Sequence, residues 1–227
     1  MRNCNCCSAL VTPHYALFKM NNRIFKDRED AARQLVTQLK KYKVLNDAVI
    51  LAIPRGALEI GAVLRDELQL PLDIVVTKKI GAPGNEEYAI GSVAPDGSVD
   101  VNKEVVAGYG IPQSYIDDEA QRLKHVIKRR YEDYRGDPNP PNLRGKTVIV
   151  TDDGIATGFT TMAAIRYIRK QKPEKIVLAV PVAASDSYEK LKKEVAKKHQ
   201  EIVVKKKEEK VRRDNEPKTL REMLLNA

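Results

Sequence analysis

Apolar runs along this chain alternate with helix-like stretches, and the alternation predicts a regular succession of strands and helices. Apolar runs of strand length lie at residues 48–53, 72–77, 148–151, 175–182 and 201–204. Helices are predicted between or before them, at residues 28–42, 58–68, 161–169 and 183–195. Short buried strands separated by helices are typical of an α/β fold with a doubly wound parallel sheet, which is the fold class that we predict.

The stretch between the second and third strands departs from this alternation. Residues 89–94 and 98–101 predict an antiparallel hairpin at a sheet edge, because an Asp-Gly turn separates two short apolar runs. Residues 112–134 predict a long helix that begins with a capping box of Ser114 and Asp117. This helix is expected to cover a ligand cleft or to pack on the hairpin, and the two placements are compatible.

A segment with turn-forming composition, residues 78–88, follows the second strand. Its two glycines, one proline and one asparagine predict a loop and not a regular element. The segment starts with Lys78 and Lys79, whose ammonium groups could reach an anion bound beyond the strand end. The alternative is a solvated pair of charges, and Lys78 is the closer of the two to the strand.

The most informative stretch begins where the strand at residues 148–151 ends. Asp152 and Asp153 come first, and a polar glycine loop and a helix follow. The first amides of a helix lack internal partners and its dipole favours negative charge, so the loop is suited to a phosphate. Glycines allow a positive φ or a close approach to a ligand, and threonines add hydroxyl donors. The candidate phosphate-binding residues are Gly154, Ile155, Ala156, Thr157, Gly158, Phe159 and Thr160.

The two acids would repel a phosphate if they faced it, so we expect them to face sugar hydroxyls or a metal ion. A ribose 5-phosphate carries a phosphate beside a cis-diol and therefore satisfies both halves of the motif. The alternative is an ordinary strand-to-helix turn in which an aspartate caps the helix. Two acids followed by Thr157-Gly158 and Thr160 form a far more specific pattern than such a turn requires.

A second loop of similar character, Pro54-Arg55-Gly56-Ala57, follows the strand at residues 48–53. The planar guanidinium group of Arg55 is always charged and offers N–H donors to an anion. Gly56 gives a ligand access to the backbone. A plain turn is the alternative. Because ligands of doubly wound sheets bind at the carboxyl ends of the strands, we expect both loops to bind anionic groups of one ligand.

Composition narrows the class of protein. The chain has 227 residues, enough for one core, and 40 Lys and Arg against 31 Asp and Glu give a net charge of +9. This balance favours anionic ligands or nucleic acid. No apolar run approaches the roughly 20 residues of a membrane span, and no signal peptide is visible. A cytoplasmic protein is therefore expected.

Both ends of the chain differ in composition from the middle. All three cysteines lie near the start, at Cys4, Cys6 and Cys7. We favour a disordered leader at this end of the chain. The alternative is a metal site in which the three cysteines are joined by His14 as the fourth ligand. Residues 197–221 hold ten basic and five acidic side chains, and no aromatic residue follows Tyr188. We expect a disordered leader at 1–25, one domain at 26–204 and a basic tail at 205–227.

The stretch from Val148 to Thr161 resembles the ribosyl-phosphate signature of type I phosphoribosyltransferases, which use 5-phosphoribosyl-1-pyrophosphate (PRPP) and Mg²⁺. The resemblance implies that Asp152 and Asp153 contact the ribose 2′ and 3′ hydroxyls, with Mg²⁺ held through those hydroxyls. It also implies that the glycine loop wraps the 5-phosphate. The loop at Arg55 and Gly56 resembles the pyrophosphate loop of the same family, with a strained or cis peptide nearby.

Three further features bear on this resemblance. Segment 78–88 corresponds to the mobile catalytic flap of the family, which implies that Lys78 or Lys79 reaches pyrophosphate. The order Lys-Lys-Ile-Gly, Asn-Glu-Glu, Ala-Ile-Gly from residue 78 onward is similar to an uncharacterised branch of predicted phosphoribosyltransferases. Ala156 is a departure, because some purine-salvage members carry an acid there that serves as general base.

The resemblance implies an enzyme that transfers ribose 5-phosphate from PRPP to a nitrogenous base and releases pyrophosphate. The implied catalytic residues are Arg55, Lys78, Asp152 and Asp153. The alternative is a regulatory protein of the same fold that binds nucleotide or RNA without turnover, for which the basic tail would suit phosphate backbones. The tail offers no ring for stacking on a base. The base is then expected to meet the hairpin, a partner chain of a homodimer, or the rings of Tyr88, Tyr131 and Tyr134.

Overall fold

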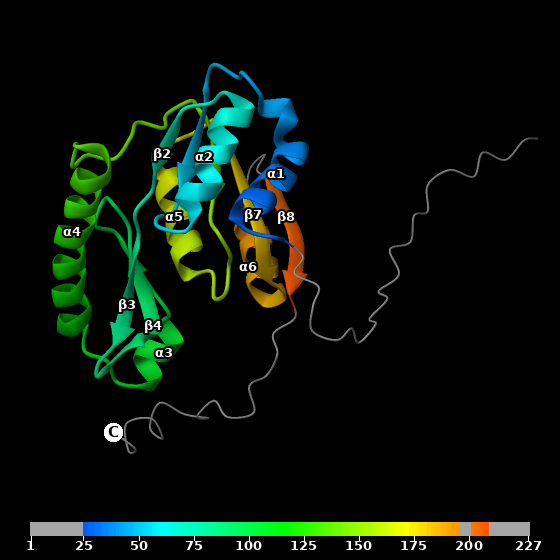
Figure 1. Cartoon of the computed structure of the whole chain (residues 1–227). Coiled ribbons are helices and arrows are strands. Elements are labelled where there is room, and N and C mark those ends of the chain that lie inside the picture. Colours follow the sequence, from blue (N-terminus) through cyan, green and yellow to red (C-terminus); the bar gives the residue numbers. More distant parts are fainter. Residues whose placement is uncertain (1–24, 196–200, 209–227) are drawn as a thin grey trace, which may run out of the picture.

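The computed structural model describes residues 25–195 and 201–208 of the chain. Its centre is a five-stranded, all-parallel sheet in the order β2-β1-β6-β7-β8 (Figure 1). The strands are β1 (Ala48–Ala52), β2 (Leu72–Ile74), β6 (Thr147–Thr151), β7 (Lys175–Ala184) and β8 (Glu201–Glu208). β1 and β6 are buried along their whole length, as expected for central strands covered on both faces. The predicted parallel α/β fold is confirmed.

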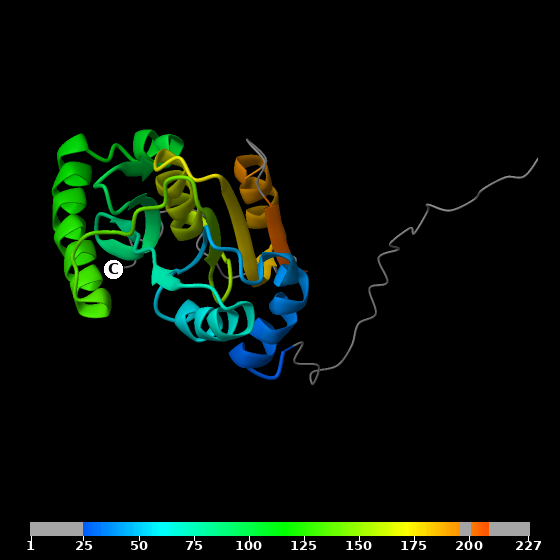
Figure 2. The ribbon, with the colours of Figure 1, turned by 90° about the horizontal axis from the view of Figure 1, so that it is seen from above.

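Helices cover both faces of this sheet (Figure 2). One face is packed by α1 (Arg28–Leu39) and α2 (Ala57–Leu68), and the other by α5 (Phe159–Lys170) and α6 (Ser185–Val195). Successive side chains of a strand point to opposite faces. Ile149 therefore joins the core under α1 and α2, whereas Val148 and Val150 join the core under α5. A short 3-10 helix, Lys40–Tyr42, continues α1.

A second layer stands beside the main sheet. It contains the antiparallel strands β3 (Lys78–Ala82), β4 (Asn85–Val93) and β5 (Val99–Val101), and the helices α3 (Lys103–Gly108) and α4 (Gln113–Arg135). The small sheet lies between α4 and α5 (Figures 1 and 2). Its core brings Ile80 and Ile90 against Ile116 and Ile127 of α4. None of the described helices is long and apolar enough to cross a membrane.

The prediction of a loop at residues 78–88 is wrong. Lys78–Ala82 and Asn85–Val93 pair as antiparallel strands, joined by a turn in which Gly84 has a φ of 76°. Ile80 is fully buried, so this segment has an inner face that its turn-forming composition concealed. The glycine at position 81 is required by packing, since a Cβ there would lie 2.5 Å from Cα of Glu86.

The predicted hairpin of residues 89–101 pairs as expected, with Gly91 opposite Val101. It belongs to the separate three-stranded sheet, however, and is not attached to the edge of the parallel sheet. This difference follows from the missed strand β3, which pairs with β4 and supplies an edge of its own. The predicted long helix, α4, packs on this small sheet. Packing on the hairpin was one of the two placements expected for it.

The helix ends test the capping predictions. Asp27 caps α1, accepting a hydrogen bond from the Asp30 amide at 2.8 Å. The capping box at Ser114 and Asp117 is wrong, because α4 already begins at Gln113 after Pro112 and has no side-chain cap. The cysteine cluster, the leader and most of the basic tail lie outside the described residues.

Tyr131 connects the two layers and generates a stability prediction. Its ring is 1% exposed, and its hydroxyl accepts a hydrogen bond at 3.2 Å from the amide of Val76, in the segment that leaves the main sheet. Replacing Tyr131 by Phe leaves that buried N–H without its partner, which costs about 1 to 3 kcal/mol. Urea unfolding of Tyr131→Phe should show this loss. Tyr134→Phe, at a ring that is 38% exposed, should stay within about 0.5 kcal/mol of wild type.

Candidate functional site

The two loops singled out in the sequence meet at one edge of the main sheet. β1 and β6 are neighbours in parallel register, with Ala52 opposite Thr151, so their carboxyl ends coincide. The contact between the loops is direct, because a Cβ on Gly56 would lie 1.9 Å from Oδ2 of Asp153. A side chain at position 56 would therefore require the Asp153 carboxylate to move.

The glycine loop after β6 leads into the N-terminus of α5. Gly158 is the N-cap residue of this helix, has a φ of 77°, and provides no side-chain cap. The amides of Phe159 and Thr160 thus begin the helix at its positive end, where an anion is favoured. Gly154 does not adopt a positive φ, so the conformational need for glycine in this loop lies at position 158.

Hydrogen bonds hold the glycine loop to the next strand and helix. The Ile155 amide donates to the carbonyl of Val182 at 3.0 Å, and the Ala184 amide donates to the carbonyl of Ile155 at 2.8 Å. The buried hydroxyl of Ser187, in the first turn of α6, donates to the carbonyl of Ala156 at 2.5 Å. The loop is thereby fixed in shape before any ligand arrives.

Asp152 is largely withdrawn from water. Its Oδ1 accepts a hydrogen bond from the Asp153 amide at 2.9 Å, and its Oδ2 accepts one from the Thr161 hydroxyl at 3.2 Å. Burial raises the pKa of Asp152 to about 7; the Asp153 carboxylate adds to the rise, and the two hydrogen bonds oppose it. The charge of the Asp152 carboxyl therefore responds to small changes in its surroundings near neutral pH.

Asp153 is the more exposed acid and has a cationic partner. Nη2 of Arg28, the first residue of α1, lies 3.1 Å from Oδ2 of Asp153, and Nη1 of the same side chain lies 3.5 Å from Oε1 of Glu59. The sequence placed Arg28 among the exposed charges of an amphipathic helix. Its position at this edge of the sheet is a feature that periodicity alone could not reveal.

Cations from two elements face the loop contact region. The peptide bond between Pro54 and Arg55 is cis, as expected near this loop, and Arg55 is exposed. Burial lowers the pKa of Lys78, and the positive charges of Arg130 and Arg55 lower it further. Lys78 is half-buried and Lys79 is exposed, both at the start of strand β3 and not on a flexible coil.

A cavity of about 420 Å³ lies between the start of β3, with Lys78 and Lys79, and α4. Its lining residues are Pro54, Thr77, Lys78, Lys79, Gly81, Glu86, Tyr115, Glu119, Arg122, Leu123 and Thr160. The Thr77 hydroxyl donates to the carbonyl of Thr160 at 3.1 Å and joins the wall to the first turn of α5. This volume is within the range of small-molecule pockets.

The aromatic ring at this cavity is one that the sequence did not single out. Tyr115 half-buries its ring there, and its hydroxyl donates to the carbonyl of Gly81 at 3.0 Å. Tyr131, which was expected to be available to a base, is instead buried in the core. Tyr115 lies one residue before the buried Ile116 on α4, so its helical phase placed it at the margin of the apolar face.

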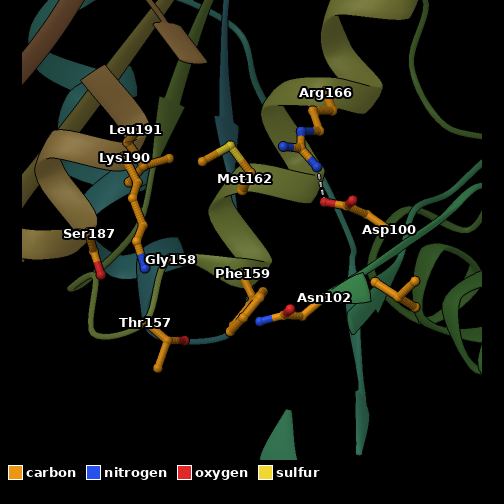
Figure 3. A pocket seen from close by; sticks show the side chains of 11 residues that line it. Asp100, Asn102, Thr157, Gly158, Phe159, Met162, Arg166, Ser187, Lys190 and Leu191 are labelled. Atoms are coloured by element: carbon orange, nitrogen blue, oxygen red, sulfur yellow. Dashed lines mark hydrogen bonds and ion pairs between the residues drawn. The ribbon is translucent and has the colours of Figure 1, made fainter. Parts of the chain in front are cut away.

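A second cavity, of about 240 Å³, lies behind the glycine loop (Figure 3). Thr157, Gly158 and Phe159 form one wall, and α5, α6 and the end of β5 form the others. Figure 3 shows the Lys190 ammonium group directed toward the loop. Arg166 of α5 is ion-paired with Asp100 across this cavity. The glycine loop therefore forms one side of this cavity.

The donor set at the sheet edge limits how a metal could be held. Within residues 25–195 and 201–208, no group of three or more His, Cys, Asp or Glu side chains is arranged to bind an ion. The acid pair offers two carboxylates, and Mg²⁺ is commonly bound by one or two carboxylates together with substrate phosphates and water. Asp152 and Asp153 thus fit a metal that arrives with an anionic ligand.

Comparison with known proteins places the chain in a family. The phosphoribosyl transferase domain family matches residues 18–215. Two curated proteins of Mycobacterium tuberculosis, named "Putative phosphoribosyl transferase MT0597" and "Putative phosphoribosyl transferase Rv0571c", are each 35% identical over 164 residues. The match covers 72% of this chain and 37% of each relative, so the chain spans little more than a third of their length.

A solved structure is similar to this chain in both sequence and fold. The crystal structure of TT1426 from Thermus thermophilus shares 33% sequence identity and a TM-score of 0.63, covering 85% of this chain and 87% of that chain. The matched family region includes both loops and the acid pair at the carboxyl edge of the sheet. The chain belongs to the phosphoribosyl transferase domain family.

Proposed function

We propose that this protein transfers ribose 5-phosphate from PRPP to a nitrogenous base and releases pyrophosphate. The main observation behind the proposal is the contact between two loops that are each suited to bind an anion. Gly56 of the loop after β1 lies against Asp153 of the loop after β6. A single ligand with phosphate groups at both ends and a cis-diol between them matches the helix N-terminus, the acid pair and the cationic loop. Family membership supports the same reaction class.

In this proposal the glycine loop anchors the 5-phosphate and the acids hold the ribose. The 5-phosphate accepts hydrogen bonds from the first amides of α5 and from the hydroxyls of Thr157 and Thr160. Asp152 and Asp153 accept hydrogen bonds from the ribose 2′ and 3′ hydroxyls. Fixing both ends of the sugar orients C1 toward the acceptor, which lowers the entropic part of the barrier.

The leaving group is assigned to the loop after β1 and to the start of β3. The bond between C1 and the pyrophosphate oxygen breaks and its electron pair leaves with pyrophosphate. A bond from the acceptor nitrogen to C1 forms, and the proton displaced from that nitrogen leaves with pyrophosphate. Arg55, Lys78 and Lys79 stabilise the charge that grows on the departing group, and Gly56 gives it access to the backbone. When bound, Mg²⁺ would be held by Asp152 and Asp153 through the ribose hydroxyls and would neutralise pyrophosphate charge.

The acceptor base is assigned to the cavity of about 420 Å³ beside Lys78. Its wall combines the Tyr115 ring with the carboxylates of Glu86 and Glu119, which can accept hydrogen bonds from the N–H groups of a base. Ala156 carries no acid, so the glycine loop supplies no general base here. The β3–β4 hairpin, and not a coil, would form the cover that excludes water.

The acid pair provides the first test. Asp152→Asn and Asp153→Asn should each lower the affinity for PRPP in Mg²⁺ buffer by at least about 10-fold, because amides are weaker acceptors than carboxylates for sugar hydroxyls. Calorimetric titration measures the affinity. Asp66→Asn, which removes the same charge from an exposed position on α2, is the matched control. A folded wild-type protein that does not bind PRPP would refute the proposed function.

The glycine loop provides the second test. Gly158→Ala forces a side chain into a left-handed backbone, which costs about 1 to 2 kcal/mol or shifts the loop. We expect it to weaken ribose 5-phosphate binding about 10-fold, again by calorimetry. Gly136→Ala carries the same strain at the end of α4, where φ is 69°, and should lower stability without changing ribose 5-phosphate affinity. Equal affinities in both variants would contradict the role of the loop.

The pKa of Asp152 gives a third test. An acid whose pKa is higher in the folded than in the unfolded state adds stability below about pH 4, and this contribution disappears as the pH rises through about 7. Without ligand, the wild type should therefore lose on the order of 2 kcal/mol more stability between pH 5 and pH 8 than Asp152→Asn does. Urea unfolding at both pH values measures the difference, and parallel pH profiles for the two proteins would exclude a buried, protonated Asp152.

A further inference from the structure

Arg28 brings a third element to the place where the two loops meet. It is the first residue of α1, and its guanidinium group lies between Asp153 of the glycine loop and Glu59 of α2, at 3.1 and 3.5 Å. The same Oδ2 atom of Asp153 that meets Arg28 lies over Gly56. The first turns of α1 and α2 and the end of β6 therefore converge on one small region.

Fold stability gives little reason for an arginine at this position. The Arg28 side chain is 48% exposed, and its carboxylate partners are 37% and 66% exposed. Ion pairs as exposed as these contribute little to folding. The helix is attached instead by its buried face, with Ala32, Leu35 and Leu39 in the core that α1 shares with α2. The position of Arg28 is better explained by what it does to charge at the sheet edge.

The electrostatics of the loop region require such a cation. Asp153 and Glu59 place two carboxylates beside the loop that is proposed to receive pyrophosphate, and both would repel it. Arg28 neutralises them and has five N–H donors, of which the two contacts engage two nitrogen atoms. Gly56, the N-cap residue of α2, has no side-chain cap, and Arg55 is exposed beside it. An anion there would meet a helix N-terminus and two guanidinium groups.

We propose that Arg28 binds the pyrophosphate group of PRPP while it remains paired with Asp153. This inference rests on the proposed function and adds to it a residue from a helix outside both loops. Arg28 links the two halves of the substrate, because one guanidinium group contacts the acid that holds the ribose and the group that leaves it. Bidentate contacts of this kind are a particular property of arginine, and lysine replaces them only in part.

The experiment compares Arg28→Gln with Arg33→Gln in the full chain. Arg33 is also on α1, is 59% exposed, and pairs with Glu29 and Glu67 at 2.7 and 3.4 Å. It thus controls for the loss of one charge and two exposed ion pairs on the same helix. Affinities for PRPP, inorganic pyrophosphate and ribose 5-phosphate are measured by calorimetry in Mg²⁺ buffer, with thermal unfolding to show that both variants fold.

Arg28→Gln should weaken PRPP and pyrophosphate binding about 10- to 100-fold and change ribose 5-phosphate binding less than about 3-fold. Arg33→Gln should match wild type for all three ligands, and Arg28→Lys should recover part of the pyrophosphate affinity. Equal losses for pyrophosphate and ribose 5-phosphate would overturn the proposal, because Arg28 would then act only through Asp153. Unchanged pyrophosphate affinity in Arg28→Gln would also overturn it. A wild type that binds none of the ligands would instead refute the proposed function.

Discussion

The parallel pairing of β1 with β6 is the constraint on which the candidate site depends. The two strands end together at Ala52 and Thr151, and the Ile53 amide continues the ladder by donating to the carbonyl of Thr151 at 3.0 Å. Two loops that lie about a hundred positions apart in the sequence therefore begin side by side. A slip of the register would separate Gly56 from Asp153, and neither loop alone could span a ligand with anionic groups at both ends.

The charged side chains at this edge of the sheet are better stabilised when a suitable ligand is bound than when the site is empty. Burial raises the pKa of Asp152 to about 7, and burial together with the positive charges of Arg130 and Arg55 lowers the pKa of Lys78. Both arrangements oppose the charged form that each side chain has in water. A ligand rich in hydroxyl groups and negative charge relieves both at once, since hydroxyls donate to the carboxylate and phosphates neutralise the cations. Perturbed groups of this kind cluster at functional sites.

The sequence predicted the parts of the protein in which local pattern and tertiary structure agree. Unbroken apolar runs predicted β1 and β6 because central parallel strands are buried on both faces. Strand β3 was missed because Gly81, Pro83 and Gly84 are typical of turns, whereas its buried side chains, Ile80 and Ala82, form too short an apolar pattern to indicate a strand. Arg28 was missed for a different reason: on an amphipathic helix it has the same pattern as Arg33, and only the fold distinguishes the two.

The two layers of the fold divide the candidate chemistry between them. The main sheet carries the two loops and the acid pair, to which the proposed function assigns the ribosyl phosphate. The segment inserted between β2 and β6 forms the small sheet and α4, and it supplies Tyr115, Glu86 and Glu119 to the larger cavity. If the acceptor binds in this cavity as proposed, substitutions in the second layer would change its choice while the loops of the first layer stay fixed. Tyr131 contributes to this arrangement, because its buried hydroxyl accepts a hydrogen bond from the Val76 amide and so links α4 to the segment between the two sheets.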